Sequence, residues 1–165
     1  MIDYELAGQD LLDASDGLMV RVWRCWVDGL DVKVQAEGGE PVTLFSDGGI
    51  SEIGIAFDQN MRWSAAYLQN GVVKLRWFDA LVGQHVVSSF GPGRDVRLCL
   101  DDKRTEELGR SDIVLAYIRG TTIYFRQQRD RFLIEYTLKS GLYEGTRLRG
   151  IGMNKNLRLQ FELVE

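Results

Sequence analysis

The sequence predicts an all-β domain of antiparallel four-stranded repeat units, β-propeller-like, with incomplete units at both ends. Apolar and polar residues alternate in short runs, as they do in strands that bury one face. Turn signals separate these runs about every 8–12 residues, in a chain of 165 residues that contains 18 glycines and 2 prolines. The chain is also self-similar with a period of roughly 40–45 residues, which is typical of propeller blades. A β-sandwich or barrel of plain meanders is the alternative.

The N-terminal elements begin with a segment of weak pattern. Residues 5–13 are interpreted as one short turn or an extended arm, and we assign residues 1–16 to an N-terminal arm. Strands are predicted over 21–26, 30–34 and 42–45, with a hairpin turn at Asp28-Gly29. The first unit, residues 17–47, therefore lacks its first strand.

Two complete units are predicted in the middle of the chain, over residues 48–91 and 94–140. Each contains a tight turn, at Asn70-Gly71 and at Arg119-Gly120, followed by an alternating strand over 73–77 or 123–125. A fourth strand closes each unit, over 84–90 and 131–138. The polar residues 101–111 are interpreted as a long loop or a short helical turn.

The last unit, residues 147–165, starts the same pattern and stops after two strands, the second over 157–163. The matching positions Asp16, Asp58, Asp101 and Asn154 are 42, 43 and 53 residues apart. One such unit cannot bury both of its faces, so the units must stack. Because open strand edges invite pairing, we expect the terminal strands to close on each other or to pair with a neighbouring chain. Three blades are few for a closed propeller, which favours assembly with partners.

Charge and cysteine content exclude several classes of protein. The net charge of −4 argues against broad nucleic-acid binding, which needs a basic surface. No run approaches the roughly 18 apolar residues of a membrane span, and the start of the chain lacks a signal peptide. Cys25 and Cys99 have no metal-ligand spacing and are interpreted as reduced, buried thiols. We therefore expect no nucleic acid and no membrane among the partners.

No group of residues matches a catalytic or cofactor motif. His85, the single histidine, has no nucleophile motif beside it and is interpreted as an ordinary strand residue. Carboxylates that could serve glycoside hydrolysis or Ca²⁺ binding are interpreted instead as solvated turns in which Asp caps a hairpin. They lie at Asp58, Asp101, Asp102, Glu106 and Glu107. We predict no catalytic residue, no cofactor and no metal site.

Arginines and aromatic residues interleave between positions 117 and 131. This mixture favours a protein interface, with a solvated strand face and single-stranded nucleic acid as lower-ranked alternatives. Trp23 and Trp26 are three positions apart, so a regular strand points them to opposite faces and one is expected at an interface or sugar-binding surface. The predicted partner interface comprises Arg119, Tyr124, Arg126, Arg129, Arg131 and Trp23.

The segments 100–104, 111–120 and 127–132, together with 57–79, resemble small virion structural proteins of tailed bacteriophages, from the tail-tip, baseplate or fibre-attachment region. The resemblance spans about residues 50–163 and carries no family active site. It implies a non-enzymatic building block of a symmetric assembly that contacts other tail proteins.

These observations lead to one expected function and one alternative. We expect a non-enzymatic structural or adaptor component of a phage tail assembly, homo-oligomeric, made in the host cytoplasm and located in the virion. The alternative is a carbohydrate-binding module that recognises a host surface glycan.

Overall fold

The computed structural model describes residues 3–10, 19–58, 60, 62–100, 113–153 and 158–165. Its regular elements within these ranges are β-strands, apart from the single 3-10 turn η1 (Gln128–Asp130). The predicted all-β class is therefore confirmed. In the described ranges, no helix is long and apolar enough to span a bilayer.

The strands form three consecutive four-stranded sheets and one two-stranded sheet, all antiparallel and connected in chain order. Unit 1 contains β1 (Asp3–Asp10), β2 (Met19–Asp28), β3 (Asp31–Ala36) and β4 (Val42–Ser46). Unit 2 contains β5 (Ile50–Phe57), β6 (Trp63–Gln69), β7 (Val72–Asp79) and β8 (Gln84–Pro92). Unit 3 contains β9 (Arg94–Leu100), β10 (Ile113–Arg119), β11 (Thr122–Gln127) and β12 (Tyr136–Lys139). Unit 4 contains β13 (Arg147–Met153) and β14 (Leu159–Val164).

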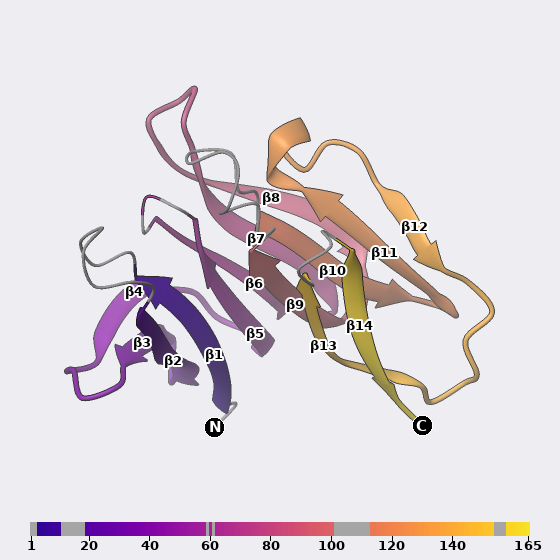
Figure 1. Cartoon of the computed structure of the whole chain (residues 1–165), viewed down its shortest axis with the longest axis horizontal. Helices are drawn as coiled ribbons and strands as arrows, with labels where there is room; N and C mark the ends of the chain where they lie inside the picture. The colour runs from indigo at the N-terminus through magenta and orange to yellow at the C-terminus, as the bar shows by residue number, and fades with distance from the viewer. Residues whose placement is uncertain (1–2, 11–18, 59, 61, 101–112, 154–157) are drawn as a thin grey trace.

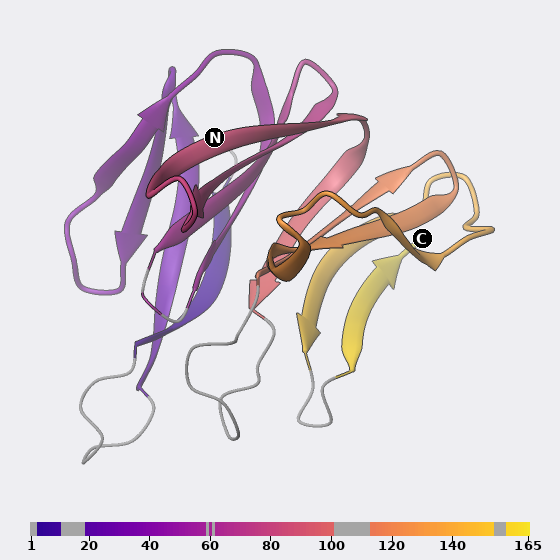
Figure 2. The ribbon, with the colours of Figure 1, turned by 90° about the horizontal axis from the view of Figure 1, so that it is seen from above.

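The four sheets follow one another in chain order and stack face to face, with the two termini at opposite ends of the stack (Figures 1 and 2). Their first strands β1, β5, β9 and β13 are neighbours in succession, as the inner strands of propeller blades are. No sheet closes into a barrel. The molecule is thus a stack of propeller-like units that forms an open fan.

Successive side chains of the central strands point to opposite faces of the sheet, and this alternation explains how each sheet packs against both of its neighbours. In β6, Ala66 and Leu68 face unit 3, whereas Ala65 and Tyr67 face unit 1. A strand with both faces buried reads as a continuous apolar run, and both β6 and β10 are buried over five or more consecutive residues. Each boundary between units is therefore a hydrophobic core.

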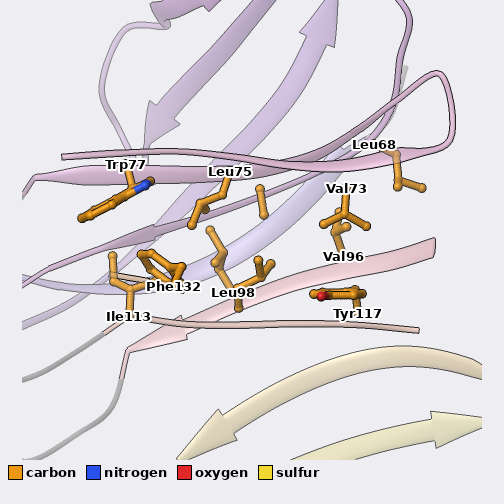
Figure 3. Packing of buried hydrophobic residues seen from close by; sticks show 11 residues of the cluster. Leu68, Val73, Leu75, Trp77, Val96, Leu98, Ile113, Tyr117 and Phe132 are labelled. Atoms are coloured by element: carbon orange, nitrogen blue, oxygen red, sulfur yellow. The ribbon is translucent and has the colours of Figure 1, made fainter. Parts of the chain in front are cut away.

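The largest core lies between units 2 and 3 (Figure 3). Leu75 and Trp77 from β7 pack there against Leu98 from β9, and the ring of Phe132 lies edge-on to Trp77 with 5.1 Å between centroids. Burying each such side chain contributes about 1.5–3 kcal/mol. Figure 3 shows Tyr117 at one end of this core, with Trp77 and Phe132 at the other.

Gly93 connects units 2 and 3 at a point where no side chain fits. A Cβ atom on this residue would lie 2.5 Å from Val73 Cγ2 and 3.2 Å from the Ile118 carbonyl oxygen. The backbone N–H of Gly93 donates instead to the Gly71 carbonyl at 3.1 Å. Glycine here allows the two sheets to approach closely.

Unit 1 differs from the sequence-based expectation in its first strand. Residues 3–10 lie within the segment expected as an arm. They form β1, and every residue of β1 pairs with a residue of β2. Unit 1 therefore has four strands rather than three, because β1 covers the edge of β2 that would otherwise stay open. The turns expected at Asp28-Gly29 and Arg119-Gly120 lie one position later, since Asp28 pairs with Asp31 and Arg119 with Thr122, whereas the turn at Asn70-Gly71 lies as expected between the paired Gln69 and Val72.

Candidate functional site

Two of the predicted interface arginines converge on one carboxylate at the boundary between units 2 and 3. Arg126 in β11 donates from Nη2 to Glu135 Oε2 at 2.9 Å, and Arg119 in β10 donates to both Glu135 oxygens at 3.1 and 3.2 Å. The Tyr117 hydroxyl donates to the same Glu135 oxygen that Arg126 contacts. The carboxylate is thus bound by three side chains from two adjacent strands.

The two arginines also connect this cluster to neighbouring segments. Arg119 donates to the carbonyl oxygens of Phe90 at 2.7 Å and Pro92 at 3.1 Å, at the end of β8 in unit 2. Arg126 donates to the Phe132 carbonyl at 2.8 Å and lies over the Phe90 ring, with 4.5 Å from Cζ to the centroid. Their guanidinium groups therefore serve internal contacts, and Tyr124 lies beneath Arg119 at 5.2 Å.

The charges in this cluster are set by their mutual contacts. Burial alone would raise the pKa of Glu135, but hydrogen bonds from the tyrosine and both arginines hold it below its ordinary value. Burial raises the pKa of Tyr117, and the adjacent carboxylate raises it further. The hydroxyl therefore keeps its proton and remains a donor to an ionised Glu135.

A related arrangement without the carboxylate lies at the boundary between units 1 and 2. Arg76 in β7 lies over the Phe45 ring at 4.4 Å, as Arg126 lies over Phe90. The rings of Phe45 and Tyr67 have centroids 5.4 Å apart, and those of Phe90 and Tyr117 are 6.5 Å apart. The strand register is also the same, because Ala65 pairs with Arg76 as Leu115 pairs with Arg126. Each of these two boundaries therefore contains a Phe–Tyr–Arg set.

The other predicted interface residues lie in three different places. Arg131 forms an ion pair with Asp79, at the end of β7 in unit 2. Burial would raise the pKa of Asp79, but this ion pair and backbone N–H groups of the following turn hold it below its ordinary value. Arg129 is exposed. Trp23 packs into the core between units 1 and 2, 4.6 Å from the ring of Phe57 between centroids.

Exposed apolar side chains flank the Arg131–Asp79 ion pair. Leu81 is 80% exposed and Val82 51% exposed in the turn between β7 and β8. Leu133 is 76% exposed and Ile134 49% exposed in the segment before β12. We call these four side chains the outer apolar surface. Leu81, Val82, Leu133 and Ile134 were not selected from the sequence, because an apolar residue near a turn signals burial as often as exposure.

A hollow of about 650 Å³ lies where the inner strands β5, β9 and β13 begin. Its lining includes Glu52 from β5, Arg94 from β9, Thr121 from the turn between β10 and β11, and Glu144 and Arg147 near β13. Tyr143, which directly precedes Glu144 in the chain, is 77% exposed.

Buried Asp95 organises one wall of this hollow. It accepts hydrogen bonds from Arg147 Nε at 2.6 Å, from Arg94 Nη1 at 2.8 Å and from the Leu148 backbone N–H at 3.1 Å. Asp95 has a φ of 55°, a left-handed conformation that costs roughly 1 kcal/mol for a non-glycine residue. Burial raises the pKa of the neighbouring Glu52, and the Asp95 charge adds to the rise.

The remaining sequence candidates have local structural roles where they are described. His85 stacks on Trp63 with centroids 3.9 Å apart, and its Nε2 lies 3.0 Å from the Trp63 carbonyl oxygen. Asp58 accepts hydrogen bonds from the backbone N–H groups of Asn60 and Arg62 and so caps a turn as expected, but it is buried rather than solvated. Burial raises the pKa of the Cys25 thiol to about 12, so this thiol stays protonated. Asp101, Asp102, Glu106 and Glu107 lie outside the described residues.

Potential metal ligands do not gather anywhere in the described part of the chain, where no group of three or more His, Cys, Asp or Glu residues could hold an ion. Comparison of the chain with known protein families, with curated proteins and with solved structures gave no match.

Proposed function

We propose that the protein is a non-enzymatic structural or adaptor subunit that makes protein–protein contacts, in an assembly such as the phage tail that the sequence resembles. The outer apolar surface is the observation that carries this proposal. It joins the β7–β8 turn of unit 2 to the segment before β12 of unit 3, which the Arg131–Asp79 ion pair connects. Clustered apolar side chains beside an arginine are characteristic of protein interfaces.

A second feature supports assembly. Strand β14 pairs only with β13 among the described strands, so its other edge presents unpaired backbone groups. Such an edge can accept a strand from another chain. Both features fit contacts with a second copy of the chain and with other tail proteins, in the virion.

The mass of the protein in solution tests self-assembly through the outer apolar surface. Light scattering after size exclusion, at several concentrations, should give a mass above that of one chain. The double variant Leu81→Asp/Leu133→Asp should reduce this mass to that of one chain, because it places charges on a desolvated surface.

Leu30→Asp is the matched control, since Leu30 is 64% exposed in the β2–β3 turn of unit 1. This variant should leave the mass unchanged. A wild-type mass equal to one chain at every concentration, or an oligomer that the double variant leaves intact, would overturn self-assembly through this surface.

Carbohydrate binding is the second candidate, and the hollow where β5, β9 and β13 begin favours it. Carboxylate, guanidinium and hydroxyl groups line the hollow, and the exposed Tyr143 directly precedes the lining residue Glu144 in the chain. Polar groups that converge near an aromatic platform suit a sugar. A glycan array should then show binding that Tyr143→Ala abolishes and Tyr143→Phe retains, and an array with no signal would remove this candidate.

A further inference from the structure

The boundary between units 1 and 2 contains three buried polar groups without a partner among the described residues, at Tyr67, Arg76 and Trp23. Tyr67 is 0% exposed, and among the described residues neither its hydroxyl nor Arg76 Nε has a hydrogen-bond partner. Leaving a buried donor unsatisfied costs about 1–3 kcal/mol, so such groups call for an explanation. The groups equivalent to those of Tyr67 and Arg76 between units 2 and 3 are both satisfied, by contacts centred on Glu135.

The register identifies what replaces the carboxylate at the first boundary. Val87 on β8 is the partner of Arg76 on β7. In unit 3, Glu135 directly precedes Tyr136, the partner of Phe125, and therefore lies beside Arg126. Val87 is 48% exposed, so the equivalent of the Glu135 position is open to solvent in unit 2.

The acidic group whose charge acts on Tyr67 has other hydrogen-bond partners. Asp47 influences Tyr67 electrostatically, but its carboxylate accepts hydrogen bonds from Gly48 N at 2.9 Å and from Gln69 Nε2 at 2.6 Å. Lys74 donates to the Gln69 side chain rather than to Asp47. Arg76 is half-buried and has the Phe45 ring as its neighbour.

We propose that Arg76 and Tyr67 form a carboxylate-binding site, in which a carboxylate from outside the fold takes the role that Glu135 has at Arg126 and Tyr117. Arg76 and Tyr67 both lie against the Phe45 ring, and a guanidinium with a tyrosine hydroxyl provides charge-assisted donors matched to a carboxylate. The carboxylate comes from an acidic side chain of a partner or from a small free acid. The site is separate from the outer apolar surface and does not depend on the proposed function.

The test follows the Arg76 side-chain Nε–H resonance by NMR in the full-length ¹⁵N-labelled protein, assigned by its loss in Arg76→Lys. Acetate at constant ionic strength should shift this resonance saturably in the millimolar range, whereas acetamide, its neutral analogue, should not. The Arg126 Nε–H resonance is the internal control and should not move, because that guanidinium already contacts Glu135.

A second pair of probes distinguishes the source of the carboxylate. Glutamate with blocked ends should shift the same resonance, and blocked glutamine should not. Tighter binding of an acidic peptide than of acetate would assign the site to a partner's side chain, and equal affinities would assign it to small acids. Equal responses to acetate, acetamide and chloride, or no response to any carboxylate, would overturn the proposal.

Two variants make the result independent of the probes. Val87→Glu supplies a carboxylate within the chain and should abolish the acetate shift, while the matched variant Val87→Gln should retain it. Tyr67→Phe removes one donor and should weaken acetate binding several-fold without removing the guanidinium. An acetate response that is unchanged in both Val87→Glu and Tyr67→Phe would contradict the proposed site.

Discussion

The two boundaries that flank unit 2 are built on the same plan but differ in two charged residues. Each joins a Phe on the outer strand of one unit to a Tyr and an Arg on the second and third strands of the next. Between units 2 and 3, Glu135 receives hydrogen bonds from this Tyr and Arg, and Arg119 adds a third donor. Between units 1 and 2, Val87 occupies the equivalent register and Gln69 stands where unit 3 has Arg119.

This difference shows how a repeat can keep its packing while changing its chemistry. The apolar contacts alone suffice to stack units 1 and 2, since a core of eight fully or almost fully buried residues lies between them. The packing between units 2 and 3 is similar, and the charge network there also fixes the orientation of the two units relative to each other. One boundary is therefore closed by its own residues, and the other retains donors for an external group.

The largest expected effect comes from removing the carboxylate. Glu135→Ala leaves two guanidinium groups and a buried hydroxyl without their common acceptor, and we expect it to lower the free energy of unfolding by about 2–3 kcal/mol. Solvent offsets part of the loss at Arg119, which is 34% exposed. Urea unfolding followed by tryptophan fluorescence measures the change.

Glu135→Gln serves as the control, because it keeps the shape and one acceptor but removes the charge. It should give an intermediate loss. A loss below about 0.5 kcal/mol for Glu135→Ala, which is the range of ordinary surface substitutions, would contradict the role of the network in stability.

A smaller effect, opposite in sign at the two boundaries, is expected from removing each tyrosine hydroxyl. Tyr117→Phe should destabilise the protein by about 1–2 kcal/mol, because it removes a hydrogen bond to an ionised acceptor. Tyr67→Phe should be neutral or stabilising by up to about 1 kcal/mol in a buffer free of carboxylates, because it removes an unsatisfied buried hydroxyl. Equal losses for both substitutions, measured by urea unfolding, would show that the boundaries do not differ as described.

The sequence predicted the strand-level architecture well and the contacts between units poorly. Alternation over 73–77 and turn residues such as Asn70-Gly71 are local signals, so the all-β class and the repeated meander followed from them. Strand β1 was missed because its alternation is weak, and its pairing with β2 is a tertiary contact. Matching Gly71 to Gly120 placed the two repeats one residue out of register. That shift hid the equivalence of Arg76 and Arg126, which the structure shows through their strand partners.

The predicted interface illustrates the same limit. A run of Arg and aromatic residues looks the same in the sequence whether its guanidinium groups contact a partner protein or a carboxylate of the same chain. The deciding residue, Glu135, lies nine positions beyond Arg126, within the strand predicted over 131–138, but the structure forms a strand only from Tyr136 to Lys139 and leaves Glu135 just before it. Buried acidic residues such as Asp95 and Asp79 were missed for a related reason, because their partners are about 52 residues away.

The smallest expected effect is a difference in acid stability, and it isolates the charge on Glu135. The folded-state pKa of Glu135 lies below its ordinary value of 4.5, so the unfolded state binds more protons in that region. Its contribution is therefore complete above about pH 4.5 and is lost as the pH falls through the folded-state pKa. Urea midpoints of wild type and Glu135→Gln should thus differ most near neutral pH and converge as the solution is acidified. Asp79, whose pKa is also lowered, is present in both proteins and cancels in the comparison. A gap that stays constant down to the lowest pH at which the protein folds would mean that Glu135→Gln acts through a lost hydrogen-bond acceptor rather than through the lost charge, and the difference between the two boundaries would then not depend on that charge.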